Sequence, residues 1–130
     1  MNAQPMTFLA LLCGVMLLSA PLRAETPIRE AEVGGAKILT DAKGMTLYTF
    51  DMDKDGASAC YDQCAVNWPP LLAEAGAVAD DDFGLTKRTD GAMQWTYYGM
   101  PLYLWVKDTA PGQTTGDGVK GVWHTAVVKE

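Results

Sequence analysis

A ten-residue segment occurs twice in the chain in similar form. Residues 44–53 read GMTLYTFDMD and residues 99–108 read GMPLYLWVKD, so five of the ten aligned positions are identical. Phe50 aligns with Trp105, which keeps an aromatic side chain at that position. Self-similarity at a fixed offset is the signature of a repeated structural unit. We interpret the two segments as copies of one such unit.

The similarity extends beyond these ten residues. The alignment that places Tyr48 over Tyr103 also places Trp68 over Trp123. We therefore expect repeat 1 at about residues 33–80 and repeat 2 at about residues 88–128. A solenoid needs roughly three or more copies to bury its faces. Two copies instead predict one domain with two-fold pseudo-symmetry.

Each copy is expected to form a β-hairpin followed by a long loop. Apolar and β-branched runs bounded by turn residues carry this prediction, and Asp90-Gly91 adds a further hairpin signal. The expected strands are residues 37–40, 46–50, 85–89, 93–97, 101–106 and 121–128.

Two segments read as short helices instead, residues 58–67 and residues 71–78. The first is followed by Trp68 and two prolines, which end a helix. Residues 109–120, rich in glycine and proline, are expected to form an irregular loop. The predicted fold class is mainly β: a small single domain of two pseudo-symmetric β-hairpin repeats, with a short helical insertion around the cysteines.

Composition excludes two classes of protein. The 130 residues carry a net charge of −6, and 48% of them are hydrophobic. That hydrophobic content can bury a core and excludes a disordered chain. Because no basic stripe is present, a nucleic-acid partner is excluded as well.

The N-terminus has the pattern of a secretory signal. Residues 8–18 carry no charge; this run is shorter than the roughly 20 residues of a membrane span and typical of a signal peptide, an uncleaved anchor being the alternative. We expect residues 1–24 to be removed after Ala24, leaving residues 25–130 as a single secreted domain without a transmembrane span. Leu12 precedes Cys13, which disfavours lipid attachment. A soluble periplasmic or secreted protein is predicted.

Cys60 and Cys64 are the two cysteines that would remain. In an oxidising compartment the expectation is a structural disulfide. The alternative is a redox or copper site in which two thiolates and His124 bind Cu(I), a soft metal.

Residues 51–56 read DMDKDG, which resembles the start of a calcium loop. Asp51, Asp53 and Asp55 would supply oxygens, with Asp62 at the twelfth position. The alternative is a polar turn in which these side chains accept backbone hydrogen bonds.

The repeat motif consists of Tyr48, Phe50 and Asp53 in one copy and Tyr103, Trp105 and Asp108 in the other. Alternate residues of a strand share a face, so each aromatic pair should lie on one side. Each aspartate should end its strand and accept backbone hydrogen bonds.

The remaining aromatic side chains, among them Trp68, Trp95, Tyr97, Tyr98 and Trp123, could form a stacking platform for a ring-shaped ligand. In a domain this small we interpret them as the core itself. The sequence contains no Ser-His-Asp order, zinc motif or phosphate loop. An enzyme is therefore not expected, nor is a cofactor beyond the calcium or copper alternatives.

The paired Tyr-x-aromatic-x-x-Asp motifs resemble a family of bacterial secreted repeat proteins of unknown function, often described as predicted lipoproteins. Further similar segments are CYDQCA (60–65), WPPL (68–71), RTDG (88–91), Gln94, YYGMPLY (97–103), Pro111-Gly112 and GVW (121–123). The resemblance implies an envelope protein and no particular reaction. The predicted function is a non-catalytic envelope module that binds another envelope protein or a small ligand, with metal binding or redox chemistry as the alternative.

Overall fold

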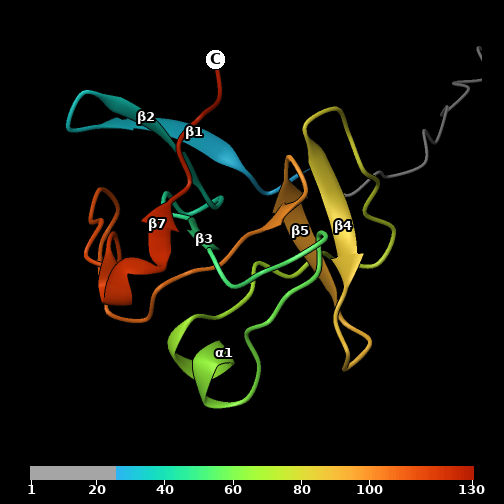
Figure 1. Ribbon diagram of the computed structural model, residues 1–130. Coiled ribbons are helices and arrows are strands. Elements are labelled where there is room, and N and C mark those ends of the chain that lie inside the picture. The colour runs from blue at the N-terminus through green and yellow to red at the C-terminus, as the bar shows by residue number, and fades with distance from the viewer. Residues whose placement is uncertain (1–25) are drawn as a thin grey trace, which may run out of the picture.

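The computed structural model describes residues 26–130, and its elements are mostly short strands (Figure 1). The signal peptide expected at residues 1–24 lies outside the described residues. One α-helix, α1 (Gln63–Asn67), and one 3₁₀ helix, η1 (Val119–Gly121), accompany the strands. The strands are β1 (Arg29–Val33), β2 (Ala36–Thr40), β3 (Tyr48–Phe50), β4 (Phe83–Lys87), β5 (Met93–Tyr97), β6 (Met100–Pro101) and β7 (Trp123–Thr125).

The strands pair across the two repeats. β1 pairs with β2 and β4 with β5, both antiparallel, and β6 extends the second pair. β3 of the first repeat instead pairs with β7 at the end of the second, and Figure 1 shows the two side by side. The two copies therefore form one unit.

A pseudo-two-fold axis passes between Tyr48 and Tyr103. The Tyr48 N–H donates to the Tyr103 carbonyl at 2.8 Å, and the Tyr103 N–H donates to the Tyr48 carbonyl at 3.0 Å. Equivalent residues of the two copies thus bond to each other in both directions, as antiparallel neighbours do.

The same reciprocity continues outward from the axis. The Leu39 N–H donates to the Ala126 carbonyl at 2.9 Å, and the Trp95 N–H donates to the Leu71 carbonyl at 2.9 Å. Leu39 and Trp95 therefore occupy equivalent positions in the two hydrogen-bond patterns. The sequence alignment does not superimpose them, because the turn of the second hairpin is slightly shorter. The duplication found in the sequence is therefore present in the backbone hydrogen bonding.

The core divides into two clusters on opposite faces of the central strands. Leu47 and Tyr48 are consecutive, so their side chains point to opposite faces. The Leu47 side contains Leu39, Leu47, Leu71, Trp95, Tyr97, Leu102 and Ala126. The Tyr48 side contains Tyr48, Cys60, Trp68, Tyr103 and Trp123.

The helix expected at residues 71–78 is wrong. The Leu71 N–H donates to the Leu102 carbonyl at 2.9 Å and the Ala73 N–H donates to the Met93 carbonyl at 2.8 Å, so the chain runs extended along the second repeat. Hydrogen-bond partners distant in the sequence override local helix preference here.

Other elements differ in length. The helix expected at residues 58–67 contains only α1, because Asp62 adopts a positive φ of 53° and the helix starts after it. The strands expected at 101–106 and 121–128 shorten to β6 and β7, with two isolated bridges at Tyr103 and one at Val127. β1 was not expected at all. Among residues 26–130, no helix has the length and apolar content needed to cross a membrane.

Candidate functional site

Two tyrosine–aspartate pairs lie at the pseudo-two-fold axis, and each joins one repeat to the other. Tyr48 Oη donates to Asp108 Oδ2 at 2.5 Å, and Tyr103 Oη donates to Asp53 Oδ2 at 2.7 Å. Both tyrosines are fully buried, with 0% of their surface exposed. The repeat motif therefore forms a reciprocal clamp between the copies.

The second oxygen of each carboxylate accepts hydrogen bonds from the loop that follows its own copy of the motif. Asp53 Oδ1 accepts from the Ala59 N–H at 2.7 Å. Asp108 Oδ1 accepts from the Thr115 N–H at 3.0 Å and from the Thr115 hydroxyl at 2.5 Å. Both aspartates thus accept backbone hydrogen bonds from the loop after the motif, and both also accept from a tyrosine of the other repeat.

The environment keeps both tyrosines protonated. Burial raises the pKa of Tyr48 and of Tyr103 well above the ordinary tyrosine value, and the neighbouring aspartates raise both further. Burial also raises the pKa of Asp53, while the Ala59 N–H and the Tyr103 hydroxyl act against that rise. At neutral pH each tyrosine is a hydrogen-bond donor rather than a base or nucleophile.

Four aromatic rings form a continuous stack across the axis, which we call the aromatic stack: Phe50, Trp123, Trp68 and Trp105. Successive ring centroids lie 4.0, 3.8 and 3.9 Å apart. Tyr48 meets Trp68 edge-on at 5.3 Å, and Tyr103 meets Trp123 edge-on at 5.1 Å. Each half of the stack takes one ring from each repeat, so the stack also ties the copies together.

The long loop at residues 109–120 packs closely against this stack. A Cβ placed at Gly116 would lie 2.8 Å from the Trp68 ring and 3.0 Å from the Tyr48 ring. The Gly116 N–H also donates to Tyr48 Oη at 3.2 Å. Only glycine allows this approach of the backbone to the rings.

A buried guanidinium joins the second hairpin to the cysteine loop. Arg88, 4% exposed, donates to Gln94 Oε1 at 2.7 Å, to Ser58 Oγ at 3.0 Å and to the Cys60 carbonyl at 2.7 Å. Ser58 Oγ lies 2.6 Å from Tyr103 Oη. No sequence pattern predicts this network of Arg88, Ser58 and Gln94, although Arg88 and Gln94 occur in the segments that carry the family resemblance.

Cys60 and Cys64 form a disulfide that ties the loop before α1 to that helix, which confirms the expected bond. The sulfurs therefore present no thiolate for Cu(I). His124, the third residue of the alternative copper site, instead has its Nε2 2.8 Å from Asp51 Oδ2. The three residues proposed for copper thus have other partners.

The residues of the calcium alternative are only partly brought together. Asp51, Asp53 and Asp55 line one cavity of about 310 Å³ beside Phe50. Asp62 is exposed at the start of α1 and does not line that cavity. Within the described part of the chain, no group of three or more His, Cys, Asp or Glu side chains is arranged to hold a metal ion.

The two ends of the aromatic stack open into cavities of opposite charge. The cavity at the Trp105 end, about 660 Å³, is called here the basic cavity. Its lining residues are Asn67, Trp68, Trp105, Lys107, Thr115, Val119 and Lys120.

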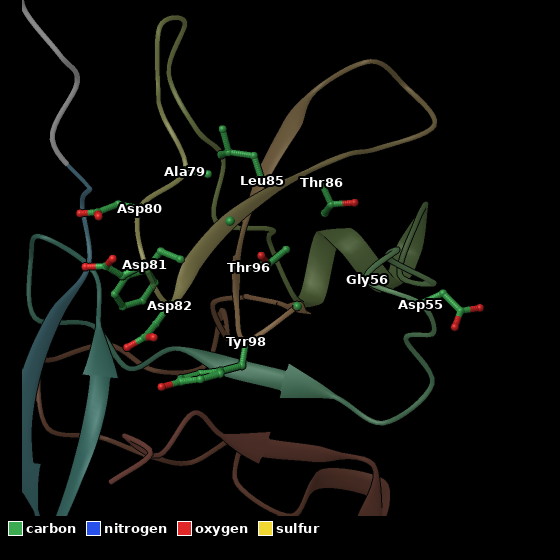
Figure 2. A pocket seen from close by; sticks show the side chains of 13 residues that line it. Asp55, Gly56, Ala79, Asp80, Asp81, Asp82, Leu85, Thr86, Thr96 and Tyr98 are labelled. Carbon is green, nitrogen blue, oxygen red and sulfur yellow. The ribbon is translucent and has the colours of Figure 1, made fainter.

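The 310 Å³ cavity at the Phe50 end is called the acidic cavity, and it shares Asp55 and Tyr98 with a neighbouring hollow of about 590 Å³. Figure 2 shows Asp80, Asp81 and Asp82 on one side of that hollow and Asp55 on the opposite side. A hydrogen bond to Asp82 raises the pKa of Tyr98.

Both repeats match a known protein family. A family model described as a secreted repeat of unknown function matches residues 34–72 and 84–127, together more than half of the chain. No curated protein and no solved structure gives a match. The two matched segments contain the strands that the hydrogen bonding relates by two-fold pseudo-symmetry.

Proposed function

The chain belongs to a family of secreted repeats of unknown function, and we propose that it is an exported, non-catalytic binding module. It works as a soluble protein in the periplasm or outside the cell, after removal of residues 1–24. Its binding sites are the cavities at the two ends of the aromatic stack.

The use of the polar groups supports a non-catalytic role. Tyr48, Tyr103 and Arg88 are buried, and their polar atoms already bond to other parts of the fold. A catalytic acid, base or nucleophile must reach a substrate and hold a suitable protonation state. These buried groups do not reach a substrate, so their role is to hold the fold together.

The observation that carries the binding role is the pair of partly exposed rings at the ends of the stack. Phe50 and Trp105 are only partly buried, and each lines a cavity. Aromatic walls with a few polar groups are typical of ligand sites. The rigid stack behind each ring holds it in place before a ligand arrives, which lowers the entropic cost of binding.

A ligand screen of residues 25–130 tests this function. Thermal unfolding is followed with neutral and acidic oligosaccharides, short basic peptides and aromatic acids, and hits are confirmed by calorimetry. We expect at least one saturable ligand that mass spectrometry recovers unchanged. Conversion of the ligand to a product would refute the non-catalytic role, and the absence of any saturable ligand would refute the binding role.

A further inference from the structure

The two ends of the aromatic stack carry different side chains, although the fold is duplicated. Lys107 aligns with Met52 of the first repeat, and Lys120 aligns with Ala65. Both lysines line the basic cavity, and none of its lining residues is acidic. In a chain of net charge −6, two lysines beside one cavity form a local site for an anion.

The aromatic wall of this cavity is a tryptophan with one face already covered. Trp105 stacks on Trp68 at 3.9 Å and is partly buried. Lys107 Nζ lies 5.6 Å from the centre of the Trp105 ring. The ammonium group therefore lies over the aromatic ring, at the end of an exposed side chain.

Two neutral hydrogen-bonding side chains complete the lining. The Thr115 hydroxyl donates its proton to Asp108 Oδ1, so its lone pairs remain to accept from a ligand hydroxyl. Asn67 is exposed and offers an amide. Such groups recognise the hydroxyl groups of a sugar. A simple aromatic acid lacks several hydroxyl groups.

Lys120 adds a conformational observation. It holds a left-handed φ of 52° although it is not a glycine. Residues in this sparsely populated region concentrate at functional sites, where the surrounding structure maintains them.

We propose that the basic cavity binds an acidic sugar, a uronic acid unit of an oligosaccharide. Its ring packs on Trp105, its carboxylate lies between Lys107 and Lys120, and its hydroxyls bond to Asn67 and Thr115. This proposal rests on the proposed binding function and names the ligand class of one of its two sites.

The test uses a pair of ligands that differ at C6 alone, a carboxylate in one and a neutral hydroxymethyl group in the other. The β-1,4-linked trimer of glucuronic acid is compared with cellotriose by calorimetry and tryptophan fluorescence, with benzoate as an aromatic acid. We expect saturable binding of the uronate at one site. Cellotriose should bind at least about tenfold more weakly. The uronate affinity should fall between about 20 mM and about 300 mM salt, because exposed charges are screened.

Variants locate the site. Lys107→Met and Lys120→Met should each weaken uronate binding about fivefold, the effect of one exposed charge contact. Trp105→Leu should remove the fluorescence change. Lys87→Met, at an exposed lysine of β4 outside the cavity, should bind like the wild type. Because the three lysines are exposed, we expect their variants to unfold at the temperature of the wild type. That result will show that the lysine variants are folded.

Four results would overturn the proposal: no uronate binding, equal binding of cellotriose, unchanged affinity in both cavity lysine variants, or preferential binding of benzoate. If the uronate fails while another ligand of the screen binds, only the sugar assignment falls. If nothing in the screen binds, the binding function itself falls.

Discussion

The hydroxyl groups of Tyr48 and Tyr103 stabilise the fold through hydrogen bonds between the repeats. Each is buried and donates to a carboxylate of the other repeat. A hydrogen bond to a charged acceptor contributes about 1.5–3 kcal/mol. The tyrosines of the motif therefore stabilise the fold mainly while they are protonated.

Alkaline pH should therefore destabilise the protein. The folded pKa of both tyrosines is raised, so their contribution is complete below about pH 10, where the unfolded tyrosines begin to ionise, and is lost as pH rises further. Each should reduce the free energy of unfolding by about 1.4 kcal/mol per pH unit above that point. Urea unfolding between about pH 8 and pH 12 measures the slope.

Tyr48→Phe should remove one tyrosine's share of this slope, and Tyr48→Phe/Tyr103→Phe should remove both. A slope that is the same in the wild type and both variants would show that other groups cause the alkaline loss.

Arg88 should be irreplaceable by lysine. Arg88→Lys keeps the charge but loses the planar fork that reaches Gln94, Ser58 and the Cys60 carbonyl together. We expect a loss of about 2–4 kcal/mol in the free energy of unfolding. Arg29→Lys, at an exposed residue of β1, serves as the matched control and should change stability by less than about 0.5 kcal/mol. Equal effects of the two substitutions would contradict the account of Arg88.

The sequence allowed the positions of the motif residues to be predicted, but not their partners. The repeat alignment made Tyr48 and Tyr103 equivalent, and their backbones bond to each other in both directions. Which aspartate each tyrosine meets depends on how the copies pack, and Asp108 lies far from Tyr48 along the chain. Nothing local to Arg88 marks a buried arginine, since arginine is usually exposed.

Among the elements, the hairpin of the second repeat was predicted from its turn, whereas β1, which Gly34-Gly35 joins to β2, and the elements fixed by distant neighbours were not predicted. The hairpin of β4 and β5 around Asp90-Gly91 follows from its turn. The segment at residues 71–73 has no such signal and becomes extended because the second repeat offers free carbonyls to it. β7 is short for the same reason, since β3 is its partner only from Trp123 to Thr125.

The disulfide should stabilise the cysteine loop by a modest amount. It spans a sequence separation of 4, for which loop closure contributes about 2 kcal/mol. The Cys60→Ser/Cys64→Ser variant should lose about that amount in urea unfolding while keeping the β-rich circular dichroism of the wild type. A loss below about 0.5 kcal/mol, the size of an ordinary surface substitution, would show that the Arg88 network holds the loop without the bond.

At the scale of the whole molecule, the two repeats should be unable to fold separately. β3 pairs with β7, and the aromatic stack alternates between the copies. Fragments 26–78 and 79–130 should each be unfolded alone by circular dichroism and regain β structure when mixed. Cooperative unfolding of either fragment by itself would contradict a single shared core.

The motif clamps one repeat to the other, and a pair of double-mutant cycles measures the coupling across this clamp. The cycle of Tyr48→Phe with Asp108→Asn crosses between repeats, whereas the cycle of Tyr48→Phe with Asp53→Asn stays within one. Unfolding free energies should give a coupling of about 1–3 kcal/mol for Tyr48 with Asp108 and below about 0.5 kcal/mol for Tyr48 with Asp53. Strong coupling within the repeat and none across it would contradict the clamp.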